Sequence, residues 1–240
     1  MIWFVALIGL CFGSFANVII YRLPQGKSIV SPPSSCQSCN TGLKWYDLLP
    51  VISWLVLRGK CRYCNTKLTA RYPVTEVMCA MIFTIIAMRF GADIYVLPLW
   101  CLAFVLLCVA WIDWDTMRIP GSLLIIAAIA GICWVLLLPF ITWQDAIIGV
   151  LAGALPLLLI DCLVQLIAKK LGFGYGDVKL MAVAGLFLGW YGIYIAYMAA
   201  FIAGGAFAVY LLATKKAERG SYLPFGPFLC FGVLLSLIIR

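Results

Sequence analysis

Two carboxylates lie at the ends of long apolar stretches of the chain. Asp113 lies between two tryptophans within three residues, and Asp177 ends a Gly-Tyr-Gly-Asp sequence. A charge near hydrocarbon is costly, so it tends to persist only where it faces water, a partner or a reaction. Two carboxyls that share one proton can serve together as acid and base, and can activate a water for peptide-bond hydrolysis. The pair therefore indicates an aspartyl protease built into a membrane.

Histidine is missing from the sequence altogether. Its absence excludes a Ser-His-Asp triad, an HExxH zinc protease and a Cys-His nucleophile pair. Carboxylates, lysines and tyrosines remain as general acids and bases, which again directs attention to the aspartates.

The residues around Asp177 leave alternatives open. Gly174 and Gly176 could bring the backbone close to a peptide substrate, or the same four residues could be a loop whose aspartate caps the next helix. Lys179 is a candidate for binding substrate or cofactor. Lys179 and Arg118 could each favour the charged form of a nearby carboxyl, or could simply set the membrane topology.

Two further aspartates compete for the catalytic role. Asp115 lies two residues beyond Asp113, and on a helix such positions point to different sides. Only one of the two is expected to face Asp177, and we favour Asp113. Asp161 lies inside an apolar stretch after Pro156; it could be the true partner of a catalytic aspartate, but we expect it to bond to polar groups within the helix bundle.

Two CxxC pairs form a second chemical signal. The four residues are Cys36, Cys39, Cys61 and Cys64. Four thiolates in such pairs can close a tetrahedral zinc site, which leaves the metal no open position for catalysis. A redox or disulfide role is the alternative, and a cytoplasmic location disfavours it. We expect structural zinc, because a loop this short has little apolar core of its own.

The composition predicts an all-α polytopic membrane protein, since 65% of the 240 residues are apolar and 11% are charged. A transmembrane helix needs about 20 mostly apolar residues. We expect about eight transmembrane helices and a small cytoplasmic zinc-knuckle insertion. The expected spans are 2–20, 74–90, 95–112, 120–139, 146–168, 180–195, 197–213 and 223–239. The region 180–213 is divided because one straight helix there would be about 51 Å long.

The positions of lysine and arginine predict the orientation, because loops rich in these residues tend to stay in the cytoplasm. All but two of the 17 cations fall on one side of the expected spans. The cytoplasmic set is Arg22, Lys27, Lys44, Arg58, Lys60, Arg62, Lys67, Arg71, Arg118, Lys169, Lys170, Lys179, Lys215, Lys216 and Arg219. Only Arg89 and Arg240 fall outside. Both termini are therefore expected outside, with Asp113, Asp177 and the cysteines on the cytoplasmic side.

The positive charge is explained by this topology and by attraction to anionic lipid, so no nucleic-acid partner is expected. We divide the chain into a first transmembrane helix (1–22), a cytoplasmic zinc-binding loop (23–72) and a transmembrane aspartyl peptidase core (73–240).

The order and spacing of several segments resemble the bacterial type IV prepilin peptidases, which are GxGD aspartyl proteases. The segments are Gly-Ser-Phe-Ala-Asn-Val-Ile-Ile-Tyr-Arg-Leu-Pro (13–24), the two CxxC pairs, Leu-Arg-Gly-Lys-Cys-Arg (57–62), Arg-Tyr-Pro-Val-Thr-Glu (71–76), Ile112-Asp113, Gly-Tyr-Gly-Asp-Val-Lys-Leu (174–180) and Pro-Phe-Gly-Pro (224–227).

The resemblance implies an inner-membrane enzyme that removes the leader of type IV prepilins or of type II secretion pseudopilins on the cytoplasmic side. It also implies N-methylation of the new N-terminal residue, with S-adenosylmethionine as methyl donor and the zinc-knuckle loop associated with that activity. By motif, Asp113 and Asp177 correspond to the catalytic pair. Glu76 matches a family motif and could contact substrate or methyl donor, or could simply favour a helix N-terminus.

Two other functions remain open from the residues alone. A proton- or cation-coupled transporter with a zinc-stabilised loop could use Asp113, Asp161 and Asp177 as a relay. A catalytically idle scaffold for pilus or secretion assembly is the other. A scaffold tolerates Asp→Asn changes, whereas a protease does not.

Overall fold

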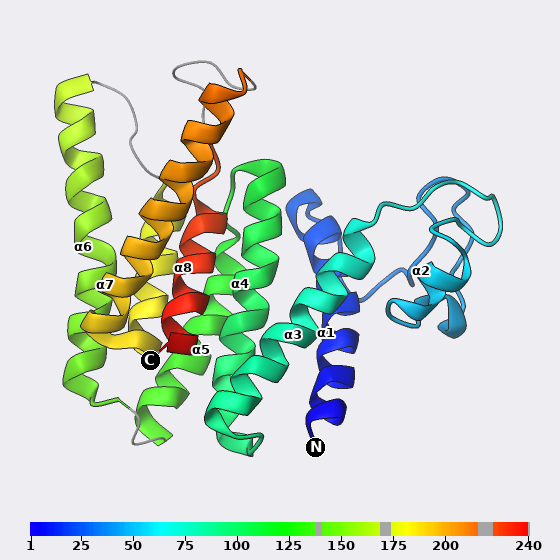
Figure 1. Cartoon of the computed structure of the whole chain (residues 1–240), viewed down its shortest axis with the longest axis horizontal. Coiled ribbons are helices and arrows are strands. Elements are labelled where there is room, and N and C mark those ends of the chain that lie inside the picture. The colour runs from blue at the N-terminus through cyan, green and yellow to red at the C-terminus, as the bar shows by residue number, and fades with distance from the viewer. Residues whose placement is uncertain (138–140, 169–173, 216–222, 240) are drawn as a thin grey trace. The chain divides into compact units, whose positions relative to one another are not determined.

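The computed structural model describes residues 1–137, 141–168, 174–215 and 223–239, and within these ranges it is helical, with two isolated β-bridges and no longer strand. The α-helices are α1 (Ile2–Arg22), α2 (Ile52–Val56), α3 (Arg71–Phe90), α4 (Leu97–Thr116), α5 (Gly121–Leu137), α6 (Trp143–Ala168), α7 (Tyr175–Ala213) and α8 (Gly226–Ile239). Three short 3-10 helices are η1 (Leu23–Gln25), η2 (Trp45–Leu48) and η3 (Ile94–Val96). The expected all-α class is confirmed (Figure 1).

The chain divides into two compact units, residues 1–96 and 97–240, which we call unit 1 and unit 2. In unit 1, α1 packs along α3. The contact is close because a Cβ at Gly13 would lie 2.5 Å from the Cα of Glu76, a distance that only glycine allows. Asn17 adds a polar link by donating its side-chain amide to the carbonyl of Tyr72 at 3.2 Å. The segment 23–70 joins these two helices and carries η2 and α2.

Unit 2 is a helix bundle around α7. This helix packs on α5, α6 and α8, while α4 packs on α5 and α8. Two buried hydroxyl groups strengthen the packing: Tyr197 donates to the carbonyl of Gly153, and Ser236 donates to the carbonyl of Gly192 at 2.7 Å. Such bonds satisfy polar groups that apolar surroundings would otherwise leave costly.

Helix α7 consists of two helical segments that meet at Gly189. This residue has φ 60° and ψ −176°, which ends the regular helix, and only glycine adopts such angles without strain. Figure 1 shows the segments before and after the break running in opposite directions. The expectation of two short helices in place of one straight helix is therefore confirmed. The break comes several residues earlier than expected, because Gly189 and not the sequence around Ala196 supplies the required conformation.

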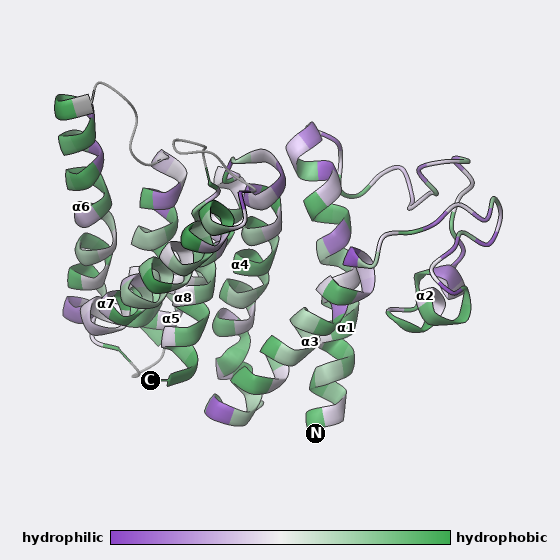
Figure 2. Ribbon diagram, turned by 45° about the horizontal axis from the view of Figure 1, so that its top comes forward, coloured by the Kyte–Doolittle hydropathy of each residue, from purple (hydrophilic) through white to green (hydrophobic). Residues whose placement is uncertain are grey.

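Apolar residues dominate the helices, as Figure 2 shows. Among the described residues, five helical stretches are long and apolar enough to cross a membrane: Ile2–Gln25, Arg71–Phe90, Ile94–Thr116, Trp143–Ile167 and Tyr175–Ala213. Helices α5 and α8 are apolar but shorter, at 17 and 14 residues. They fall below the length of about 20 residues that a straight crossing needs, so the number of eight spans stays a prediction.

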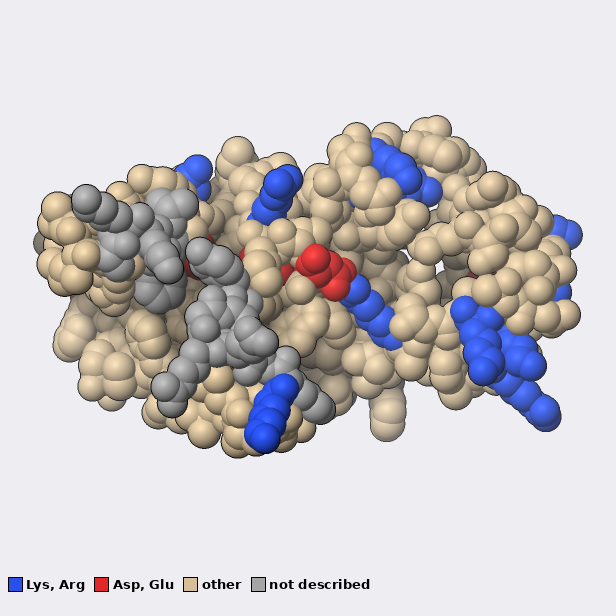
Figure 3. All heavy atoms as spheres, turned by 90° about the horizontal axis from the view of Figure 1, so that it is seen from above, with Lys and Arg blue, Asp and Glu red and all other residues tan. Residues whose placement is uncertain are grey.

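Figure 3 looks onto the end of the α1 and α3 helices from which the segment 23–70 emerges, and Lys and Arg side chains are visible on this part of unit 1. The orientation expected from the sequence stays a prediction. Five of the cations used for that expectation lie outside the described residues: Lys169, Lys170, Lys216, Arg219 and Arg240.

Candidate active site and metal centre

Asp113 lies in the last turn of α4, and its side chain is buried, with 6% of the residue exposed. Its Oδ2 accepts a hydrogen bond of 3.0 Å from the backbone N–H of Gly226, the first residue of α8. The first N–H groups of a helix have no partner within the helix, so they readily donate to a carboxylate. The start of α8 therefore fixes the orientation of the Asp113 carboxyl group.

Asp177 lies in the first turn of α7, and Gly174 is the residue that directly precedes this helix. Its backbone N–H donates to the carbonyl of Gly174 at 3.0 Å. Its Oδ1 is buried and, among the described residues, has no hydrogen-bond partner. A buried carboxyl oxygen without a partner is costly unless a ligand, a water or a proton satisfies it.

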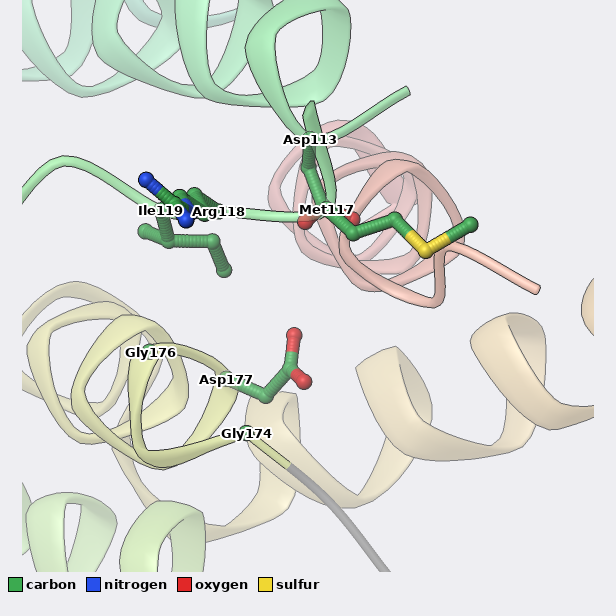
Figure 4. A pocket seen from close by; sticks show the side chains of 7 residues that line it. All are labelled: Asp113, Met117, Arg118, Ile119, Gly174, Gly176 and Asp177. Atoms are coloured by element: carbon green, nitrogen blue, oxygen red, sulfur yellow. The ribbon is translucent and has the colours of Figure 1, made fainter. Parts of the chain in front are cut away.

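The two carboxyls line one pocket of unit 2, with a volume of about 320 Å³. Figure 4 shows the Asp177 carboxyl pointing toward the side of the pocket from which Asp113 projects. The remaining lining residues are Met117, Arg118, Ile119, Gly174 and Gly176. The end of α4, the turn that follows it and the start of α7 thus bring together two aspartates that are 64 positions apart in the chain.

The glycines of the Gly-Tyr-Gly-Asp sequence both line this pocket. At Gly176, a Cβ would lie 2.8 Å from the Cβ of Ile119. A side chain at position 176 would therefore push the turn after α4 away from the start of α7. Gly176 serves close approach of two segments, which is one of the roles considered from the sequence, although the neighbour here is the protein's own chain.

The structure separates the other acidic candidates from this pocket. Asp115 is exposed and does not line it. Asp161 is buried in α6, where Gln165 donates its side-chain amide to Oδ2 at 2.6 Å. This contact agrees with the expectation that Asp161 bonds within the bundle. Lys179 is exposed and does not line the pocket, whereas Arg118 does.

The four cysteines of the two CxxC pairs come together in unit 1. Their Sγ atoms all lie within 4.8 Å of one another, and Cys36 and Cys64 are 3.8 Å apart. Zinc held by four thiolates at about 2.3 Å requires sulfur atoms about 3.8 Å apart. The sulfur atoms therefore fit a tetrahedral zinc site, although the second pair follows the first by 21 intervening residues.

The two knuckles have the same internal structure. In each, the first cysteine donates its N–H to a threonine carbonyl and accepts an N–H from an asparagine: Cys36 with Thr41 and Asn40, and Cys61 with Thr66 and Asn65. Both asparagines have positive φ, 54° and 57°. The sequence Cys-x-x-Cys-Asn-Thr occurs at both places and was the signal that could have predicted this repeat.

The threonines also contact the second cysteine of each knuckle. The hydroxyls of Thr41 and Thr66 lie 3.3 Å from the Sγ atoms of Cys39 and Cys64. The hydroxyl and backbone N–H of Thr66 lower the pKa of Cys64 to about 6, and Thr41 lowers the pKa of Cys39 in the same way. Bonds that favour the thiolate favour metal binding, because zinc binds the deprotonated sulfur.

Asp47 links η2 to the second knuckle. Its carboxylate forms an ion pair with Arg62 at 2.7 Å and accepts hydrogen bonds from the Tyr63 hydroxyl and the Lys44 N–H at 3.0 and 3.2 Å. Burial alone would raise the pKa of the Asp47 carboxyl, but these three donors outweigh burial and hold that pKa below its usual range. Burial and the bond to Asp47 raise the pKa of Tyr63 to about 12. Asp47 therefore stabilises the loop by joining η2 to the second knuckle. The spacing of the cysteines did not predict this role.

Comparison with known proteins agrees with this pair of sites. The chain matches the family model of the bacterial peptidase A24 N-terminal domain over residues 7–90 and that of the type IV leader peptidase family over residues 100–209. It is 30% identical over 254 residues to a protein of Pseudomonas putida named prepilin leader peptidase/N-methyltransferase, with 97% of this chain and 88% of that protein covered. A protein of Aeromonas hydrophila with the same name is 31% identical over 258 residues, with 98% and 89% covered. The chain belongs to the type IV leader peptidase family.

The two family models divide the chain close to the boundary between its compact units, residues 1–96 and 97–240. In this leader peptidase family member, α3 groups with α1 and the cysteine loop, whereas both pocket aspartates belong to unit 2. No solved structure matches the chain significantly.

Glu76 lies in unit 1 and contacts the chain's own loop. It is 7% exposed, and its Oε2 accepts a hydrogen bond of 2.7 Å from the backbone N–H of Val51. The sequence suggested contact with substrate or methyl donor, or a preference for a helix N-terminus. The observed contact is a third role, in which Glu76 ties the loop to α3.

Gly226 contacts the pocket residue Asp113, although from the sequence it was known only as part of a motif. Gly226 belongs to the Pro-Phe-Gly-Pro segment, for which no role was assigned, yet its N–H binds Asp113. A Cβ at Gly226 would lie 2.6 Å from Oδ2 and 2.9 Å from Cγ of Asp113. The family motif was the available signal, but its contact with α4 depends on tertiary packing.

Proposed function

We propose that this family member is a membrane-embedded aspartyl endopeptidase that removes the leader of type IV prepilins, with Asp113 and Asp177 as its catalytic carboxyls. The observation that carries the proposal is that both carboxyls line one pocket, in a chain whose relatives are named prepilin leader peptidases. Among the described aspartates, the two at the pocket are the pair singled out by the sequence.

The reaction needs one carboxyl as a base and one as an acid. We assign the base to Asp113, since the N–H of Gly226 donates to it and a hydrogen bond to a carboxylate favours its charged form. Asp177 is then the acid, and its unpartnered Oδ1 is the oxygen that can donate a proton to the substrate carbonyl.

In the first step, Asp113 accepts a proton from a water molecule whose oxygen adds to the scissile carbonyl carbon, while Asp177 donates its proton to the carbonyl oxygen. In the second step, the C–N bond breaks as the proton on Asp113 passes to the departing amine. Asp177 regains its proton from a hydroxyl of the tetrahedral intermediate as the new carboxyl group forms. The pair returns to its starting state with one water consumed.

Gly226 has a positioning role in this scheme. Its N–H orients Asp113, and the absence of a side chain leaves room for the carboxyl group. A displaced base loses alignment with the attacking water, and small errors of alignment are costly in such reactions.

The second proposed activity is N-methylation of the residue exposed by cleavage, as the names of the relatives indicate. S-adenosylmethionine would supply an electrophilic methyl group for the free amine. The described residues do not identify where that donor binds, so we assign no side chain to it. Cys36, Cys39, Cys61 and Cys64 would hold zinc as a structural ion, and the loop 23–72 is proposed to serve methyl transfer.

The proposed setting is the bacterial inner membrane, with the zinc loop and the pocket on the cytoplasmic side and both termini outside. The clustering of lysine and arginine supports this orientation. Type II secretion pseudopilins are proposed as further substrates, because the resemblance to the family implies them.

The direct test is incubation of the purified wild-type protein with a type IV prepilin in detergent, with and without S-adenosylmethionine, followed by mass spectrometry of the product. We expect loss of the leader in both reactions, and addition of one methyl group only with the donor present. Ion flux into proteoliposomes is measured in parallel. Ion flux without any leader removal would contradict the peptidase proposal and support the transporter hypothesis.

A further inference from the structure

Helix α2 of the cysteine loop has an apolar face that no described residue covers. Ile52, Leu55 and Val56 are 58%, 60% and 71% exposed. Their spacing places them on one side of the helix. Trp54 points the other way, since its indole ring lies against Gly59 and its Nε1 is buried. Figure 2 shows α2 as an apolar element within the otherwise polar loop.

The apolar surface continues into the residues before α2. Trp45 is 75% exposed, and Leu48 and Leu49 are 42% and 39% exposed. Exposed apolar side chains that recur along one short segment of a polar loop indicate a surface that is covered by a partner or a membrane.

A hydrogen bond to α3 fixes the position of α2 along that helix. The N–H of Val51, the residue before α2, donates to Glu76 at 2.7 Å. Glu76 lies five residues after the start of α3, a predicted transmembrane helix. At 1.5 Å per residue this is about 7.5 Å along the helix from its first residue. Helices that lie in a membrane interface bury their apolar face by about 5–10 Å.

Val51 adopts a backbone conformation that the surrounding structure must maintain. Its φ is 59°, which is unfavourable for a β-branched residue. Such strain persists where the neighbouring contacts determine the conformation. The bond to the buried Glu76 carboxylate is one such contact, so the position of α2 beside α3 is fixed by more than chain connectivity.

Cations border this surface. Lys44 precedes η2, and Arg58 and Lys60 follow α2; all three are exposed. Lysine and arginine at the edge of an apolar face attract anionic lipid head groups near a charged membrane surface. The combination of an apolar face and bordering cations is typical of an interfacial helix.

We propose that α2 and the preceding η2 form a lipid-contacting foot, which inserts the side chains of Ile52, Leu55 and Val56 into the boundary between head groups and acyl chains. The Val51–Glu76 bond sets how deep this foot lies. The cysteine loop is then held against the membrane surface beside α1 and α3 and does not move freely in the cytoplasm. This inference concerns unit 1 alone and does not depend on the catalytic roles of Asp113 and Asp177.

The test places the photo-crosslinker p-benzoylphenylalanine at position 55, and in a second variant at position 52. Each protein is reconstituted into vesicles of phosphatidylethanolamine and phosphatidylglycerol and irradiated, and adducts are identified by mass. Gly42 is the matched control position in the same loop, because a side chain there would meet no atom within 4 Å. Thermal unfolding of all three proteins verifies that they are folded.

We expect phospholipid adducts at positions 55 and 52 with a yield about tenfold or more above that at position 42, because burying one leucine-sized side chain biases its occupancy by at least that factor. Equal lipid yields at all three positions would overturn the proposal. So would adducts at 52 and 55 that join only to protein, whether to residues 97–240 or to a second copy of the chain.

Discussion

In unit 1 the reactive side chains come from one short polar loop, whereas in unit 2 they come from helices that are far apart in the chain. The cysteines of each knuckle are arranged by local turns in which Asn40 and Asn65 take positive φ. Asp113 and Asp177 line one pocket only because α4, α7 and α8 pack together. The difference teaches that the metal site depends on its own ligand and turn chemistry, while the pocket depends on the bundle.

Among these predictions, removal of zinc should have the largest effect on stability, and the loss of stability should be confined to unit 1. Structural zinc stabilises a folded knuckle by about 10–16 kcal/mol at neutral pH. We therefore expect Cys36→Ser combined with Cys61→Ser, or treatment with a chelator, to abolish protection of residues 36–68 from hydrogen exchange. Methyl transfer should be lost as well.

The helices of unit 2 should keep their protection, and Cys11→Ser, at an exposed cysteine outside the cluster, should change nothing. Full protection of the loop without metal would show that the sulfur atoms are held by other forces. Loss of protection throughout α4 to α8 would contradict the separation between the two regions.

The second-largest predicted effect is on the rate of leader removal, when Gly226 of unit 2 is replaced by alanine. In Gly226→Ala, the new Cβ would displace the Asp113 carboxyl, since it would start 2.6 Å from Oδ2. A misplacement of about 1 Å at a catalytic group can cost about 10²-fold in rate. We expect kcat for leader removal to fall by roughly that factor with KM unchanged, as measured with a purified prepilin.

Two glycines provide the controls for this change. Gly205→Ala should be neutral, because a Cβ there meets no atom within 4 Å. Gly232→Ala, in the same helix as Gly226, would clash with the backbone of Ala196 and should lower thermal stability. If Gly232→Ala reproduced the kcat loss of Gly226→Ala at equal stability loss, disruption of α8 packing would explain both.

The smallest predicted effect follows from loss of the ion pair between Asp47 and Arg62 within the loop. Asp47→Asn removes the ion pair with Arg62 and should cause a severalfold rise in hydrogen exchange near residues 44–63 at neutral pH. Because folding lowers the pKa of Asp47, its carboxylate stabilises the loop fully above the unfolded pKa of about 3.9. That contribution is lost as the pH falls from there through the lower pKa of the folded state.

The difference between wild type and Asp47→Asn should therefore disappear as the pH is lowered through that range. Asp93→Asn, at an exposed aspartate of the same unit, is the control and should leave exchange unchanged. A difference that persisted at low pH would mean that the amide perturbs the loop by a route other than charge.

Features that depend on residue type or short spacing could be predicted from the sequence. The four clustered cysteines, the all-α class and the interruption of α7 are of this kind, because hydropathy and ligand spacing are local properties. The position of the α7 break was missed by several residues, since hydropathy does not indicate which glycine takes a positive φ.

Contacts between distant segments could not be predicted in this way. The bond from Val51 to Glu76 joins a loop to a helix, and the bond from Gly226 to Asp113 joins the first residue of α8 to the last turn of α4. Neither residue type implies its partner, because any backbone N–H can donate and any carboxylate can accept. The repeated Asn-Thr after each CxxC pair was a local signal that could have been used.

The central claim is that Asp113 and Asp177 carry out hydrolysis, and the rate of leader removal from a purified prepilin by Asp113→Asn and Asp177→Asn tests it most directly. Both variants should lose about 10²- to 10⁴-fold, while methylation of an already cleaved pilin continues and verifies folding. Asp115→Asn and Asp161→Asn should retain leader removal. Cleavage at the wild-type rate by either pocket variant, or its loss in Asp161→Asn with folding intact, would contradict the account.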